Sequence, residues 1–383
     1  MDYLTITRSC FTEINREKFY KLAQKGHKVG MVYPEKLLFE NEYKTHDPVI
    51  NTTAESYPLP AVFDNPRITL FKGLGKLIKQ QKPKYVYTEY DPASLLGVYL
   101  SVLSLIYNYK LLFISCENLS LRLPQILKRE GIKGLLVGIF KNITVWLTRI
   151  GKYHVAVLSD DGIQVFKEKG YKSLSKIHLG FDAKYFNVNA DIRKEIRNQL
   201  SIPDDKVVIA YFGRIVPEKG VDTLLEALNL IKEKDWIFLI DEFKQYENEY
   251  AQTIKNMISE FGFENRTIFF DADHYEIAKY MNASDIAVVP SKTTKKWKEQ
   301  FGRIAPEAMS CGNAVIASDS GTLKEIVTNY GLIFKEGNYH DLADRLNYLL
   351  DNPEKIKELG QKCADRAAER YTIDKEVELV LEM

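Results

Sequence analysis

Residues 299–307 read Glu299-Gln300-Phe301-Gly302-Arg303-Ile304-Ala305-Pro306-Glu307. A continuous helix through this stretch is disfavoured, because Gly302 makes unusual backbone conformations accessible at little energetic cost. Pro306 instead suits the first turn of a helix that begins close to it. The stretch therefore predicts a loop that carries Glu299 and a short helix that carries Glu307 in its first turn.

The predicted helix ends at Gly312 and lies between two apolar segments, 287–291 and 314–318, that are typical of buried strands. Free N–H groups near residues 304–307 and the helix dipole favour an anion such as phosphate at this point. A carboxylate on each side suits a ligand with hydroxyls, because an ionised carboxylate accepts hydrogen bonds from a diol. A nucleotide sugar carries both phosphate and diols. Two solvated glutamates in a surface loop are the plainer alternative for this stretch taken alone.

Two motifs link this stretch to a known family. Residues 307–318 read Glu307-Ala308-Met309-Ser310-Cys311-Gly312-Asn313-Ala314-Val315-Ile316-Ala317-Ser318, and residues 213–220 read Gly213-Arg214-Ile215-Val216-Pro217-Glu218-Lys219-Gly220. Their order and spacing resemble the signature of retaining GT-B glycosyltransferases of family 4. The resemblance covers residues 150–383 well and residues 1–150 loosely.

The resemblance implies an α/β fold with two Rossmann-like domains whose parallel sheets face each other across an interdomain cleft. We expect an acceptor-binding domain at 1–180, a donor-binding domain at 181–365, and a C-terminal helix, 366–383, that returns to the first domain. The implied activity is transfer of a sugar from a nucleotide diphosphate to a glycan, lipid-linked or other acceptor, with retention of configuration. This corresponds to a hexosyltransferase-type enzyme of polysaccharide biosynthesis.

The motifs also predict the residues of the site. A guanidinium forks onto phosphate oxygens and an ammonium adds a point charge, so Arg214 and Lys219 are expected to hold the donor diphosphate. By resemblance, Glu307 holds the ribose hydroxyls and Glu299 the transferred sugar. The expected catalytic residues are thus Glu299, Arg214 and Lys219, and the expected donor-binding residues are Gly213, Arg214, Lys219, Phe301, Gly302, Arg303, Ile304 and Glu307. Surface cations paired with a neighbour such as Glu218 are the structural alternative. No side chain is identified as a base, and in the family the leaving phosphate is thought to take the proton of the acceptor.

Composition sets further limits. A chain of 383 residues suits two domains, and 45% hydrophobic with 27% charged residues is typical of a globular protein. The 53 basic and 52 acidic residues nearly cancel, which gives no indication of nucleic-acid binding. The four cysteines lack metal-ligand spacing, and no secretory signal precedes the first strand, so we expect a cytoplasmic protein.

No cofactor or metal is expected beside the nucleotide-sugar donor, which we expect to be UDP- or GDP-linked. Asp271-Ala272-Asp273 resembles the metal motif of the other large glycosyltransferase fold, but three-residue motifs match by chance, so we predict a turn there. Two other places depart from the family pattern, because glycine-rich turns are replaced at residues 9–12 and 241–243. These departures motivate the rival hypothesis, a non-catalytic partner subunit that binds a nucleotide sugar.

Residues 122–152 hold seven basic residues and one acid, Glu130, between apolar runs. Such a pattern is typical of a segment that lies on an anionic membrane surface, as expected for an enzyme whose acceptor is membrane-borne. Two helices packed on the first domain with a solvated basic face would give the same pattern, and this is the more frequent explanation.

We also expect a helix from Phe11 to Lys25, a long loop over 34–66, and Glu89, Asp91 and Glu117 as candidates either for acceptor contacts or for plain solvated carboxylates.

Overall fold

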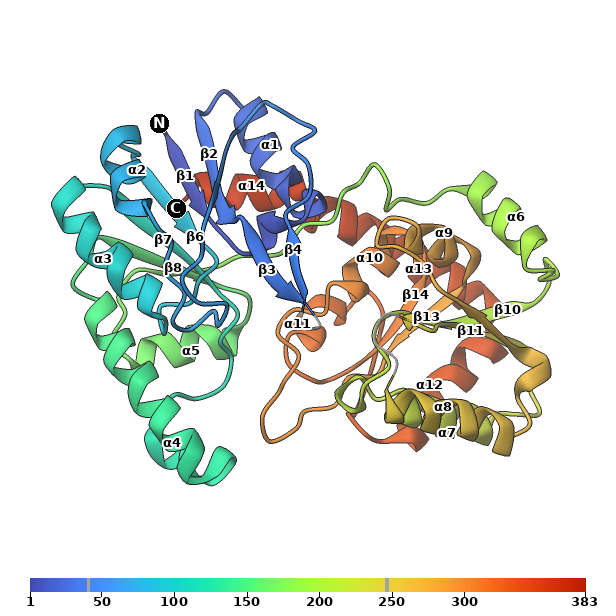
Figure 1. Ribbon diagram of the computed structural model, residues 1–383. Helices are drawn as coiled ribbons and strands as arrows, with labels where there is room; N and C mark the ends of the chain where they lie inside the picture. The colour runs from blue at the N-terminus through green and yellow to red at the C-terminus, as the bar shows by residue number, and fades with distance from the viewer. Residues whose placement is uncertain (40–41, 245–247) are drawn as a thin grey trace. The chain divides into compact units, whose positions relative to one another are not determined.

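The computed structural model describes residues 1–39, 42–244 and 248–383. These residues form two compact units, Met1–Gly180 with Ile373–Met383, and Phe181–Thr372 (Figure 1). The returning C-terminal segment therefore begins later than the expected residue 366. The chain passes between the units at residues 180–181 and 372–373, and a hydrogen bond within each unit holds these segments. In the second unit the Phe181 amide donates to the Tyr371 carbonyl at 2.9 Å, and in the first the Gly180 amide donates to Glu376 at 2.8 Å.

The first unit is built on a parallel sheet with the strand order β5-β2-β1-β6-β7-β8-β9. Its strands are β1 (Tyr3–Ile6), β2 (Val29–Pro34), β5 (Glu55–Leu59), β6 (Tyr85–Thr88), β7 (Lys110–Ser115), β8 (Tyr153–Val157) and β9 (Leu174–Lys176). The helices that accompany it are α1 (Glu17–Gln24), α2 (Leu74–Gln81), α3 (Leu95–Tyr107), α4 (Leu123–Thr148), α5 (Asp160–Glu168) and α14 (Ile373–Leu381). Apolar side chains of the sheet and of α3 form its core, as expected for a sheet covered by helices.

Two expectations for this unit are wrong. Residues 34–66 are not one long loop, because they contain the antiparallel strand pair β3 (Lys36–Phe39) and β4 (Glu42–Thr45) as well as the edge strand β5, while residues 40–41 lie outside the described part. The helix expected from Phe11 begins only at Glu17, since two short 3₁₀ turns, Ser9–Phe11 and Glu13–Arg16, precede it. Arg16 explains the delay, because its buried guanidinium binds the carbonyls of Cys10 and Phe11 and thereby fixes a tighter local path.

The second unit holds a parallel sheet with the order β12-β11-β10-β13-β14-β15. Its strands are β10 (Val207–Tyr211), β11 (Trp236–Asp241), β12 (Thr267–Phe270), β13 (Ile286–Val289), β14 (Ala314–Ser318) and β15 (Leu332–Phe334). Its helices are α6 (Ala190–Gln199), α7 (Val221–Leu230), α8 (Glu249–Glu260), α9 (Ile277–Ala283), α10 (Ile304–Ser310), α11 (Leu323–Val327), α12 (Tyr339–Asp351) and α13 (Pro353–Arg370). The central strands are fully buried, as their nearly continuous apolar sequences require.

Residues 299–307 fold as expected. Residues 290–303 form a loop after β13, and α10 starts at Ile304 with Pro306 and Glu307 in its first turn. The helix ends before Gly312, whose φ of 84° only glycine adopts without strain. The strand β14 follows at once, at the residues that the sequence indicates.

Candidate functional site

The order of strands in the second sheet defines where a ligand would bind. β10 lies between β11 on one side and β13 on the other, so the direction of winding reverses between β10 and β13. In open α/β sheets, ligands bind outside the carboxyl ends of the strands at this reversal. Residues 212–220 leave β10 at that edge, and the loop 290–303 leaves β13 beside them. Both family motifs therefore meet at this edge.

Lys219 and Glu299 form the centre of the site. The Lys219 ammonium lies 2.6 Å from the Glu299 carboxylate, which also accepts a 2.8 Å hydrogen bond from the Ser291 hydroxyl. Glu299 is buried, and the Lys219 ammonium nitrogen lies 5.0 Å from the centroid of the Trp297 ring. The structure thus brings together two predicted catalytic side chains that are far apart in sequence. Their mutual pairing was not predicted.

The turn after β10 brings Arg214 to the same edge. The buried Tyr211 hydroxyl donates a 2.6 Å hydrogen bond to the Arg214 carbonyl, which fixes the turn. Burial raises the pKa of Tyr211 well above its ordinary value, and the charges of Glu299 and Arg214 both act on this phenol. Gly213 adopts a φ of 115°, and a side chain there would point at Ile304, the first residue of α10. Arg214 is thus exposed at the edge of the sheet that also carries Glu299, and the charges of both residues reach Tyr211.

A close contact with Gly321 fixes the backbone of the loop that carries Glu299. Gly321 follows β14, and a Cβ at this position would lie 1.9 Å from the Glu299 carbonyl oxygen. The Thr322 amide donates to the same carbonyl at 3.4 Å. Only a residue without a side chain permits this approach, so the loop that carries Glu299 is held by backbone contacts before any ligand arrives.

Glu307 lies on α10 with its carboxylate almost fully buried. Its Oε1 has no hydrogen-bond partner among the described residues, while the Arg303 guanidinium is 3.5 Å away and the His274 ring nitrogen 3.8 Å away. Burial raises the pKa of Glu307 to about 7, and the charge of Arg303 opposes this shift. A buried carboxylate with an unused acceptor atom suits a ligand that donates hydrogen bonds.

His274 is a site residue that sequence reasoning missed. It follows β12, packs its ring against Phe186 at a centroid distance of 5.5 Å, and lies 3.3 Å from the Arg303 guanidinium. Burial first, and Arg303 second, lower the pKa of His274 to about 4. Its approach to Glu307 is therefore not an ion pair near neutral pH. The only signal in the sequence is its place at the carboxyl end of a strand, directly after Asp271-Ala272-Asp273.

The raised pKa of Glu307 predicts a pH-dependent stability. An acid whose folded pKa exceeds its unfolded value of 4.5 contributes stability fully below pH 4.5, and this stability is lost as pH rises through about 7. Glu307→Gln, which stays neutral, should therefore be more stable than the native chain at pH 8, by an amount on the order of 3 kcal/mol, and equally stable near pH 4. Urea unfolding of both proteins at the two pH values measures the difference. An equal difference at both pH values would show that Glu307 is not a buried titrating acid.

Two expectations about this helix need correction. The N–H groups near 304–307 are not all free, because the Ala305 amide donates to the Gly302 carbonyl at 2.9 Å and the Glu307 amide to the Arg303 carbonyl at 3.1 Å. Phe301, expected among the donor-binding residues, has its ring buried at 6.1 Å from the Tyr371 ring. Any contact of Phe301 with a donor would therefore come from its backbone.

The replaced glycine turn at 241–243 places an acid beneath the site. The Asp241 carboxylate accepts a 3.0 Å hydrogen bond from the Phe243 amide. Burial raises the pKa of Asp241 to about 7, while hydrogen bonds from the amides of Phe243 and Gly213 lower it. Asp241 therefore connects the end of β11 to the Gly213 turn. Asp271, the first acid of the Asp-x-Asp sequence, accepts the Lys244 amide at 3.2 Å in the loop after β12.

The carboxyl edge of the first sheet holds the expected acceptor candidates, all of them paired. Glu89 follows β6, accepts a 2.5 Å hydrogen bond from Ser9 after β1, and pairs with Lys18. The other two candidates also have partners: Asp91 accepts a hydrogen bond from the Ser115 hydroxyl, and Glu117 forms an ion pair with Lys141. None of these three acids is therefore a plain solvated carboxylate, as the structural alternative supposed.

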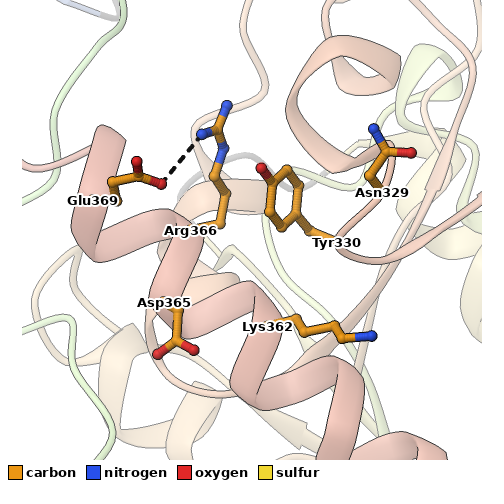
Figure 2. A pocket seen from close by; sticks show the side chains of 6 residues that line it. All are labelled: Asn329, Tyr330, Lys362, Asp365, Arg366 and Glu369. Atoms are coloured by element: carbon orange, nitrogen blue, oxygen red, sulfur yellow. Dashed lines mark hydrogen bonds and ion pairs between the residues drawn. The ribbon is translucent and has the colours of Figure 1, made fainter.

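A hollow elsewhere on the second unit is not this site. It has a volume of about 520 Å³ and lies beside α13 (Figure 2), lined by Asn329, Tyr330, Lys362, Asp365, Arg366 and Glu369. The Arg366 guanidinium stacks on the Tyr330 ring at 4.7 Å and lies 3.4 Å from Glu369. Lys362 and Asp365 are also engaged, with Glu358 and Gln361, and none of the predicted donor-binding residues lines the hollow.

Comparison with known proteins finds a family model that matches the part of the chain that carries this site. Residues 192–369 match the family model of glycosyl transferases group 1. This group 1 segment contains the Gly213, Lys219, Glu299 and Glu307 cluster. A glycosyltransferase of Methanocaldococcus jannaschii described as uncharacterized is 32% identical over 205 residues, which are 46% of this chain and 55% of that protein. The D-inositol 3-phosphate glycosyltransferase of Corynebacterium glutamicum is 30% identical over 202 residues, 51% of this chain and 47% of that protein. The chain thus spans about half the length of these curated relatives.

Solved structures extend the likeness to the whole chain. Sucrose-phosphate synthase from Thermosynechococcus elongatus superposes with a TM-score of 0.73 at 20% identity, covering 100% of this chain and 98% of that one. HepE of Anabaena in complex with UDP gives 0.72 at 18% identity, covering 100% and 99%. At such identities the likeness shows the fold alone. The group 1 segment therefore belongs to a chain with the GT-B fold of two Rossmann-like domains, as the sequence predicted.

Proposed function

We propose that the chain is a glycosyltransferase that moves a sugar from a nucleotide diphosphate to an acceptor hydroxyl with retention of configuration. The observation that carries the proposal is the cluster of Lys219, Glu299 and Glu307 at the strand reversal of the second sheet, beside the start of α10. Cations for a diphosphate and carboxylates for hydroxyls on both sides match the two halves of a nucleotide sugar. The group 1 match and the solved complexes of HepE with UDP and UDP-glucose support the same ligand class.

In this proposal each side chain has one task. Negative charge grows on the leaving diphosphate as the bond between the sugar carbon and the phosphate oxygen breaks. Lys219 and Arg214 stabilise that charge in a partly buried site. Glu299 orients the transferred sugar through its hydroxyls, and Glu307 accepts hydrogen bonds from the ribose hydroxyls. The acceptor oxygen then bonds to the sugar carbon, and its proton passes to the leaving phosphate oxygen.

The donor base can be found by thermal shift with a panel of UDP-, GDP- and ADP-sugars. A ligand that binds only the native state raises the free energy of unfolding, by about 2.7 kcal/mol at one hundred times its Kd, and therefore raises the Tm. We expect one base, uracil or guanine, to give the largest shift, and an NMR assignment of the product anomer to show retention. Stabilisation by no nucleotide sugar would reject the proposal, and binding without turnover would favour a non-catalytic subunit.

Transfer is also proposed to need no metal ion. Cationic side chains take the role of the metal at the diphosphate, and Asp271 is engaged with the Lys244 amide. Activity should therefore survive EDTA, and Asp271→Ala should retain activity within about twofold, as is usual for a surface substitution. Turnover assays with and without chelator measure both effects. Loss of activity on chelation and its return with Mn²⁺ or Mg²⁺ would indicate that the Asp-x-Asp sequence binds a metal.

The acceptor is proposed to be a glycan or lipid-linked sugar presented at a membrane surface. The basic and apolar composition of residues 122–152 is the motive. Among the described residues, no helix has both the length and the apolar character needed to cross a bilayer.

A further inference from the structure

The helix α4 carries an apolar stripe on its outer face. The helix breaks at Gly131, where φ is 69°, so that residues 132–148 form a second straight segment. Along it, exposed apolar side chains recur three and four positions apart, the spacing that places residues on one face of a helix. Their exposed fractions are 79% for Ile132, 69% for Leu136, 39% for Ile139, 54% for Ile143, 61% for Trp146 and 48% for Ile150, just past the helix end.

The opposite face of the same segment packs on the first unit with small and polar residues and with the buried Val145. Gly138 faces Ile126 of the preceding segment so closely that a Cβ would approach its side chain to 2.8 Å. The Asn142 amide donates to the Leu121 carbonyl at 2.8 Å, and the Thr148 hydroxyl binds Tyr171. The segment therefore packs on the first unit, as one of the two alternatives for 122–152 supposed, but its exposed face carries the apolar stripe as well as basic residues.

A neighbouring helix extends the apolar surface. The exposed side chains of α3 include Val102, Leu105 and Ile106. The backbone of α3 is adjacent to the end of the stripe, because the Lys152 amide donates to the Ser104 hydroxyl at 3.2 Å. Figure 1 shows α3 and α4 together on one side of the first unit. Exposed apolar side chains that recur along two neighbouring helices differ from the single scattered ones of an ordinary surface.

The charged residues next to this apolar surface indicate which kind of partner it would bind. Lys128 and Lys133 flank the break in α4, are exposed, and take part in no ion pair within the described residues. Four other cations of the basic stretch are engaged elsewhere: Arg122 pairs with Glu168, Arg129 with Glu130 and Lys141 with Glu117, and Arg149 packs its guanidinium against Gly170. A second copy docked through the same stripe would bring like charges together, whereas an anionic lipid surface complements them.

We propose that the outer faces of α3 and α4 form a lipid-docking surface, in which the stripe from Ile132 to Ile150 enters the headgroup region of an anionic membrane and Lys128 and Lys133 contact the lipid phosphates. This deepens the proposed function by defining the surface that would bring the enzyme to a membrane-borne acceptor. Trp146 fits the role, because tryptophan side chains favour the boundary between headgroups and acyl chains. The attachment is peripheral, at a depth of about 5–10 Å.

Vesicle co-sedimentation of the full chain tests this surface. The native protein should pellet with phosphatidylcholine vesicles that contain about one-third phosphatidylglycerol at low salt, and much less with pure phosphatidylcholine or at high salt. Leu136→Glu with Ile143→Glu should weaken binding at least about tenfold, and Lys128→Glu with Lys133→Glu about 25-fold or more, since each cation near the surface contributes roughly fivefold. The matched controls are Leu230→Glu, an equally exposed apolar residue on α7, and Lys357→Glu on α13, and both should bind like the native chain.

The outcomes separate this proposal from that of the enzyme. Lys219→Ala should bind vesicles normally, and the Leu136/Ile143 variant should release nucleotide diphosphate in solution at the native rate. Native protein that stays in the supernatant with anionic vesicles at low salt would overturn the docking surface. So would light scattering that shows a native dimer of twice 44.2 kDa which Leu136→Glu dissociates, because a second copy would then cover the stripe.

Discussion

Replacing Lys219 or Arg214 with alanine should lower turnover about 100-fold or more while the chain stays folded. Each cation is placed to stabilise charge that grows on the leaving diphosphate, a contribution of roughly 3 kcal/mol per group. Lys219 has the larger expected effect, because its side chain is only 21% exposed while Arg214 is exposed, and charges interact more strongly where water is excluded. Rates of nucleotide diphosphate release with saturating donor measure the loss.

Controls distinguish catalysis from stability. Arg214 is exposed, so its truncation should leave the Tm unchanged, whereas Lys219→Ala also leaves Glu299 without its ammonium partner and should lower the Tm. Lys357→Ala, a change at an exposed lysine on α13, should retain native turnover. Native turnover in Arg214→Ala and in Lys219→Ala would show that neither cation contacts the diphosphate.

Glu299→Gln should abolish most turnover without weakening the binding of the free nucleotide diphosphate. Glutamine keeps the size of the side chain and can still accept the hydrogen bond from Ser291, but it no longer carries the charge that pairs with Lys219. In the native chain a diphosphate must compete with Glu299 for this ammonium. The variant should therefore bind the nucleotide diphosphate as tightly as the native chain or more tightly, while turnover falls about 100-fold or more because the sugar loses its charged acceptor.

Calorimetry and kinetics together distinguish the effect of Glu299→Gln on nucleotide diphosphate binding from its effect on turnover. The Kd of the nucleotide diphosphate is compared with the rate of sugar transfer in the native chain, Glu299→Gln and Lys219→Ala. Lys219→Ala should weaken both, which makes it the matched contrast. Equal losses of nucleotide diphosphate affinity and of turnover in Glu299→Gln would mean that Glu299 holds the nucleotide rather than the sugar.

The second unit was predictable from sequence for a physical reason. Strands such as β10 and β14 are buried on both faces, so they appear as unbroken apolar runs. Gly312 and Pro306 mark the ends of the short helix between β13 and β14 through backbone preferences that do not depend on tertiary contacts. The local order of strand, loop and helix therefore follows from the sequence alone.

The edge of the first sheet was not predictable in this way. β5 pairs with one neighbour only, contains Pro58, and has no fully buried residue, so its sequence resembles a loop. Likewise, the pairing of Lys219 with Glu299 joins positions 80 residues apart, and only the folded sheet brings them together. The apolar stripe of α4 is visible in the sequence, but its outward direction is set by the glycine and threonine residues that pack inward.

The proposed sugar transfer is best tested by the release of nucleotide diphosphate from a panel of UDP-, GDP- and ADP-sugars by the native chain and by Glu299→Gln. We expect the native chain, supplied with an acceptor glycan, to turn over sugars on one base, and Glu299→Gln to lose this turnover while it still binds the free nucleotide diphosphate. Binding of that nucleotide diphosphate by the native chain with no turnover of any donor in the panel would contradict the proposed transfer.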